Sequence, residues 1–144
     1  MKHLINFLKL PFKTKRILVE AYLCLGFSRF IIWRFQFKRF AWIFGAVNQE
    51  TEFSNDIIDV KKVREVSRAI HIMQRHTFWE SKCLAQAYTA RLMLNRRKQT
   101  CTVYFGVAKG QQGEMTAHAW VRCGEIFVTG GDGSKGFTVT SKFA

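Results

Sequence analysis

Several residue types and patterns are scarce in this sequence of 144 residues. Proline occurs once, and the hydrophobic content of 48% includes 14 phenylalanines, which excludes a disordered or low-complexity chain. The most apolar region, 17–44, is broken by charged side chains and lacks the roughly 18–20 apolar residues of a membrane span. The N-terminus has no signal-peptide pattern. We therefore expect a cytoplasmic protein with the length of one domain.

Cysteines at metal-binding spacing are also missing. The four cysteines, Cys24, Cys83, Cys101 and Cys123, include no C-x-x-C pair, and none has zinc-finger spacing to a histidine. This argues against a structural metal site. Without an export signal, all four are expected to be free thiols. The sequence predicts no metal and no other cofactor.

Acidic residues are few, with 10 Asp and Glu against 23 Lys and Arg, a formal net charge of +13. Such an excess favours an anionic partner, whether nucleic acid, an anionic membrane surface or an acidic peptide, although it can also simply solubilise a surface. In residues 1–50, Phe and Trp are interleaved with Lys and Arg. A non-catalytic basic binding module therefore stays an alternative, but no nucleic-acid-binding motif is present, which makes that partner improbable.

The chain divides into a helical region, 1–76, and a second region, 77–144. Helices are predicted over 15–34, 37–47, 57–76 and 82–97, with caps at Thr14, at Asn55 or Asp56, and at Ser81. The first two are apolar over a wide arc, so they are either deeply buried or shared with a partner. Alternating patterns predict strands over 100–108, 117–123, 125–129 and 137–141. Helices followed by an antiparallel meander indicate one α+β domain.

One cysteine and one histidine stand out. Cys83 falls in the first turn of its predicted helix, where unpaired backbone N–H groups favour a thiolate nucleophile. His118 lies on an alternating strand, which can hold a base rigidly. Asp132, in the next glycine-rich loop, could orient that base, with Glu125 as the alternative. Because single cysteines are usually inert and Asp is a common turn former, spacing alone is weak evidence.

Three segments resemble a known family. They are SKCLAQA at 81–87, HAWV at 118–121 and GGDG at 130–133, and they resemble the stand-alone leader peptidases of lasso peptide biosynthesis, within the transglutaminase-like superfamily. Leu10-Pro11, Trp79 and Phe137-Thr138 extend the likeness over nearly the whole chain. The resemblance implies a transglutaminase- or papain-like cysteine peptidase core, in which the helix carrying the cysteine packs on the antiparallel sheet carrying the histidine.

The family's activity is removal of the leader peptide from a ribosomally made precursor. Carried over, Cys83 is the nucleophile, His118 the general base and acid, and Asp132 the orienting acid. The backbone N–H of Cys83 and the indole of Trp79 would hold the oxyanion. The implied partners are the precursor peptide, a separate leader-recognition protein and the lasso cyclase that closes the macrolactam. Transglutaminases use the same trio to acylate an amine, so an acyltransferase stays open, as does contact with a membrane face.

Overall fold

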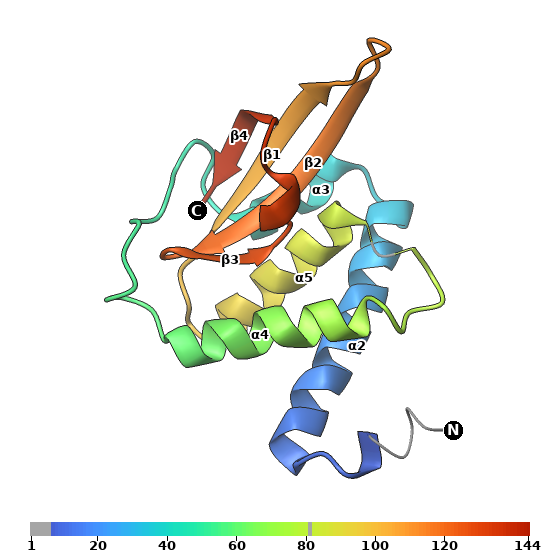
Figure 1. Cartoon of the computed structure of the whole chain (residues 1–144), viewed down its shortest axis with the longest axis vertical. Helices are drawn as coiled ribbons and strands as arrows, with labels where there is room; N and C mark the ends of the chain where they lie inside the picture. Colours follow the sequence, from blue (N-terminus) through green and yellow to red (C-terminus); the bar gives the residue numbers. More distant parts are fainter. Residues whose placement is uncertain (1–6, 81) are drawn as a thin grey trace.

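The structure is a computed structural model that describes residues 7–80 and 82–144, and its helices pack against one face of an antiparallel sheet (Figure 1). The helices are α2 (Phe12–Arg34), α3 (Phe37–Phe40), α4 (Val60–Met73) and α5 (Cys83–Arg96), with the 3-10 turn η1 (Ala41–Phe44) after α3. The strands are β1 (Thr102–Lys109), β2 (Met115–Cys123), β3 (Ile126–Thr129) and β4 (Thr138–Phe143), with η2 (Gly131–Gly133) before β4. The predicted α+β class is confirmed.

None of the described helices combines the length and the apolar character that crossing a bilayer requires. The longest, α2, begins at Phe12 behind Pro11, and no side chain caps it. The prediction that Thr14 caps this helix is therefore wrong. Proline at this boundary has its φ fixed close to the helical value and has no N–H that would need a partner.

The next two helix starts also differ from prediction. The amphipathic helix α4 begins at Val60, where the carboxylate of Asp59 accepts a hydrogen bond from the Lys62 N–H at 3.1 Å. Neither Asn55 nor Asp56 is the cap, because Asn55 bonds across to Glu125 and Asp56 bonds to a neighbouring serine. For α5 the N-cap position is Lys82, and the predicted cap, Ser81, lies outside the described residues.

One hydrophobic core joins the helical region to the sheet. Its fully buried members include Leu25 of α2, Ile70 of α4, Ala87 of α5 and Val121 of β2. The small side chains of α5 let this helix lie close to its neighbours, and a buried hydrogen bond of 2.8 Å between the hydroxyls of Ser28 and Thr89 fixes it against α2. The helix that begins with Cys83 is therefore held by both other long helices and by the sheet.

The strand order is β3-β2-β1-β4. The predicted meander is right for β1, β2 and β3, but β4 does not follow beside β3. It pairs instead with the outer edge of β1, where Val103 faces Phe143. The connection over 130–137 therefore has to cross β2 and β1 to reach that edge (Figure 1). This crossing brings the glycine-rich loop onto the sheet.

Candidate active site

Alternation along β2 separates its two faces. Ala119, Val121 and Cys123 belong to the core under the helices. Because side chains alternate along a strand, His118, Trp120 and Arg122 lie on the other face. This second face is the one that the 130–137 connection crosses: His118 contacts both ends of that connection, Gly130 and Phe137.

The imidazole of His118 is held in one orientation. Its Nε2 lies 2.9 Å from the carbonyl oxygen of Gly130, and a carbonyl can only accept, so Nε2 carries the proton and donates it. The ring lies between Trp120 and Phe137, with ring centroids 5.7 and 5.2 Å away. Among residues 7–80 and 82–144, the other ring nitrogen, Nδ1, has no hydrogen-bond partner. The neutral tautomer set by this contact leaves Nδ1 as the basic nitrogen.

The loop over 130–133 fits the ring because it has little side chain. At Gly130, φ is +69°, and a Cβ would lie 2.6 Å from the Ala119 carbonyl oxygen and 3.2 Å from the His118 Nε2. At Gly133 a Cβ would lie 2.9 Å from the same nitrogen. The glycines therefore do more than form a turn, because they let the backbone approach a histidine ring closely.

Asp132 sits in this loop, in the η2 turn, and is exposed. Asp132 lies between Gly130 and Gly133, the two glycines that approach the His118 ring. In the described part of the protein, however, no hydrogen bond or ion pair joins its carboxylate to the ring. The Gly130 carbonyl occupies Nε2 instead. The alternative acid, Glu125, lies beyond the opposite end of β2 and bonds to Asn55 at 3.1 Å, roughly 17 Å along the strand from His118.

Cys83 is the first residue of α5 and is half-buried against the core. The first hydrogen bond of the helix ladder runs from the Gln86 N–H to the Lys82 carbonyl. The amide N–H of Cys83 therefore lies in the first turn, ahead of the ladder. Within the described residues its thiol makes no hydrogen bond, either to His118 or to another group. Helix α5 packs on β2 from the core side, which carries Ala119 and Val121. The helix of Cys83 therefore adjoins the strand of His118, but not the face of the strand on which the imidazole lies.

The other cysteines differ from Cys83 in their surroundings. Cys101 and Cys123 are fully buried, and a hydrogen bond from Cys123 lowers the pKa of Cys101 to about 7, with Arg91 acting in the same direction. Burial raises the pKa of Cys24. All four cysteines are free thiols. Full burial keeps the Cys101 thiol from a substrate despite its lowered pKa.

Residues 30–142 match the family model described as the transglutaminase-like superfamily. The chain belongs to the transglutaminase-like superfamily. The match runs from the second half of α2 to β4 and includes Cys83, His118 and Asp132. No curated protein and no solved structure matches the chain.

Trp79 lies four residues before the cysteine of this transglutaminase-like domain. Its indole N–H is buried and has no hydrogen-bond partner in the described parts of the chain. The ring packs on Tyr22, with centroids 5.2 Å apart, and α2 approaches it at Gly26, where a Cβ would lie 3.3 Å from the indole. A buried donor without an acceptor is costly, so an incoming acceptor at this position would be favoured.

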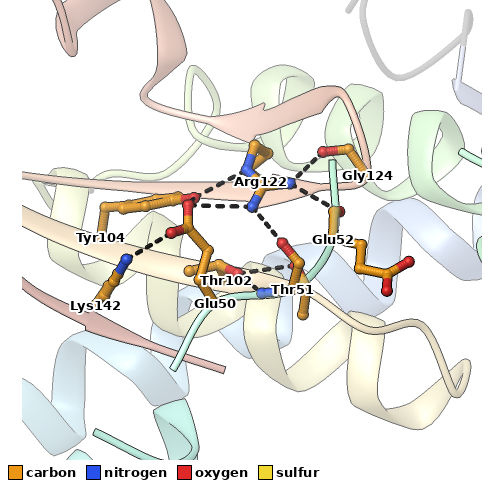
Figure 2. Close-up of polar contacts among 8 residues, drawn as sticks. All are labelled: Glu50, Thr51, Glu52, Thr102, Tyr104, Arg122, Gly124 and Lys142. Atoms are coloured by element: carbon orange, nitrogen blue, oxygen red, sulfur yellow. Dashed lines mark hydrogen bonds and ion pairs between the residues drawn. The ribbon is translucent and has the colours of Figure 1, made fainter. Parts of the chain in front are cut away.

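A polar network supports the face that carries the histidine (Figure 2). Arg122 is buried and donates to the Tyr104 hydroxyl and to the backbone carbonyls of Thr51 and Glu52, and it pairs with Glu50. Hydrogen bonds from Lys142 and then from Tyr104 hold the pKa of Glu50 below its usual value. Nothing in the local sequence around Arg122 predicts these partners, because Glu50, Thr51 and Glu52 lie about 70 residues earlier in the chain.

This network reaches the histidine through aromatic rings. Tyr104, which bonds to Arg122, stacks on Trp120 with centroids 5.5 Å apart and planes 12° from parallel. Trp120 in turn stacks against His118. The guanidinium of Arg122 also lies 3.5 Å from the ring centroid of Phe53. The network therefore helps to hold Trp120, which packs against the His118 ring, in its position.

Proposed function

We propose that the chain is a cysteine peptidase that removes the leader peptide from a ribosomally made lasso precursor, with Cys83 as nucleophile and His118 as base. Membership of the transglutaminase-like superfamily supports a cysteine acyl-enzyme chemistry, and the likeness of the three motifs supports the substrate. The observation that carries the proposal is the bond from His118 Nε2 to the Gly130 carbonyl, because it leaves Nδ1 without a partner among the described residues, as a general base requires.

In the proposed reaction, Nδ1 takes the thiol proton and the Cys83 sulfur attacks the scissile carbonyl carbon. The first-turn amide of Cys83 and the unpartnered indole N–H of Trp79 donate to the oxyanion. His118 returns the proton to the leaving amine as the C–N bond breaks. Water then attacks the thioester with His118 as base, which releases the leader as a carboxylic acid and restores the thiol.

The loop of Gly130 would stabilise the imidazolium that forms during these steps. Its carbonyl accepts from Nε2, and Asp132 adds a carboxylate two residues further on. In this arrangement the Gly130 carbonyl would orient the imidazole, and the negative charge of Asp132 would stabilise the imidazolium without a direct hydrogen bond. Among the described residues no hydrogen bond joins the Cys83 thiol to Nδ1, and the proposal requires that the two atoms come within hydrogen-bond reach when the leader is bound.

The test is cleavage of a precursor peptide in the presence of its leader-recognition protein, followed by mass spectrometry. Wild type should yield a leader with a free carboxylate and a core with a free amine, which the lasso cyclase partner would then close. Cys83→Ala and His118→Ala should abolish both products, and the matched control Cys24→Ala should retain them. Cleavage by Cys83→Ala at the wild-type rate would exclude this nucleophile.

Superfamily membership also favours a second candidate, acyl transfer to an amine. The first half of the reaction is the same, and only the acceptor of the thioester differs. Cleavage in the presence of a large excess of a small primary amine separates the two candidates. A leader that carries the amine as an amide, with no free acid formed, would establish transfer in place of hydrolysis.

A further inference from the structure

The long helix α2 has two apolar faces. One face, with Leu18, Ala21 and Leu25, is buried in the core. On the opposite face, large apolar side chains recur at steps of three and four residues and are between 47% and 79% exposed. These are Phe12, Val19, Leu23, Phe27 and Phe30, which we call the outer stripe. The recurrence of these residues on one line of a helix shows that the exposure is patterned.

Cations accompany the outer stripe. Arg16 and Arg34 fall on the same line, at the remaining three- and four-residue steps, and both are exposed. The one acidic residue of α2, Glu20, is already paired with Arg96 and Arg97 at 3.2 and 2.6 Å. The stripe is therefore an apolar line with a net positive charge, and no acidic group on this helix is free to offset it.

The stripe is also long, narrow and accessible. From Phe12 to Phe30 it runs about 27 Å along a single helix, and the N-terminal part of α2 extends beyond α4 (Figure 1). Monomeric proteins seldom leave an apolar surface of this extent uncovered unless something binds there. Because α2, although 23 residues long, is not apolar enough to cross a bilayer, an occupant has to lie against one side of the helix.

We propose that the outer stripe docks the protein on an anionic membrane surface, with α2 lying in the plane of the headgroups. Phenylalanine and leucine would enter the boundary of the acyl chains, and the arginines would reach the lipid phosphates. A second copy of the chain is disfavoured as occupant, because it would bring one molecule of charge +13 against another. The proposal is independent of the chemistry at Cys83.

Sedimentation with vesicles tests the proposal. The wild-type protein should bind vesicles of phosphatidylcholine mixed with phosphatidylglycerol at least about tenfold more tightly than pure phosphatidylcholine, and added salt should reduce this difference. Trp33, 74% exposed on the same helix, should shift its emission to shorter wavelength on binding. Absence of binding to the anionic vesicles, or equal binding to both kinds, overturns the proposal.

The variant Leu23→Glu/Phe27→Glu should reduce binding to anionic vesicles by about a hundredfold, since it removes two apolar contacts. The matched control is Ile57→Glu/Met115→Glu, which makes the same change in charge at two exposed apolar residues outside α2, and should bind nearly as wild type. Circular dichroism checks folding, and Phe12→Ser/Phe30→Ser is the milder second variant.

Equal loss of binding in the stripe variant and the control would mean that net charge alone attracts the protein, and this would overturn the assignment to α2. Sedimentation without lipid provides the other decisive comparison. An oligomer that forms in the wild type and disappears in the stripe variant would identify a second copy as the occupant and refute the membrane proposal.

Discussion

Substitution of Gly133 by alanine should disable the histidine without unfolding the protein. The added Cβ would lie 2.9 Å from Nε2 and 3.3 Å from Cε1 of His118, whereas comfortable contacts between such atoms are about 3.5–4.0 Å. The ring would have to retreat by roughly 0.5–1 Å. Since Nε2 is 2.9 Å from its acceptor at Gly130, a shift of this size would weaken or break that hydrogen bond.

A base misplaced by about 1 Å can cost roughly a hundredfold in rate, so kcat/KM for leader removal should fall by one to two orders of magnitude. The loop is exposed and Gly133 has no positive φ, so the melting temperature should hardly change. The control is Lys135→Ala, an exposed residue of the same connection. Nitrogen NMR of the histidine should show a loss of the Nε2-protonated tautomer. A variant with wild-type kcat/KM and an unchanged tautomer would refute the reasoning that the glycines hold the ring.

Three further predictions concern stability and reactivity. The hydrogen bond from Arg97 lowers the pKa of Glu20. The contribution of this pair to the free energy of unfolding is therefore present above the unfolded pKa of about 4.3, and it is lost as pH falls through the lower folded value. Glu20→Gln should lower the free energy of unfolding by about 1–2 kcal/mol at pH 7 in urea, and the difference from wild type should vanish in acid. Arg122→Met should cost about 3 kcal/mol in the same assay, because it leaves buried acceptors and an acid without their partner; a loss below about 1 kcal/mol would contradict the role given to the network. Iodoacetamide at mildly alkaline pH should label Cys83 in the folded protein, while Cys101 reacts only after denaturation because it is fully buried; peptide mapping of the labelled sites decides between these outcomes.

The sequence predicted the element types well where one periodicity dominated. In β1, Val103 and Phe105 alternate with Thr102, Tyr104 and Gly106, and both of them contribute to the hydrophobic core. The helix of Cys83 begins at the residue predicted to lie in its first turn. The alternation in β1 and the start of the Cys83 helix both follow from the spacing of apolar residues, which a short stretch of sequence is enough to show.

Prediction failed where a distant segment determined the local conformation. Residues 37–47 look helical, yet the helix is short and η1 ends at Phe44, just before Gly45, where φ is +108°. Ala46 and Asn48 then donate to the carbonyls of Ala144 and Lys142 at 2.8 Å each. A Cβ on Gly45 would lie 2.3 Å from the Ala144 carbonyl oxygen. The end of the chain, nearly a hundred residues away, therefore terminates this helix, and no local propensity contains that information.

The candidate site shows the same division between local pattern and long-range placement. The residue types at Cys83 and His118, and the face on which His118 lies, follow from sequence. The partner of Nε2 does not, because it is a backbone carbonyl, and any residue type could supply it. What brings that carbonyl to the ring is the position of β4 beside β1, which forces the 130–137 connection over the sheet. A glycine-rich segment shortly after a candidate base is thus a signal for close backbone approach, and in this chain the strand order determines which ring it approaches.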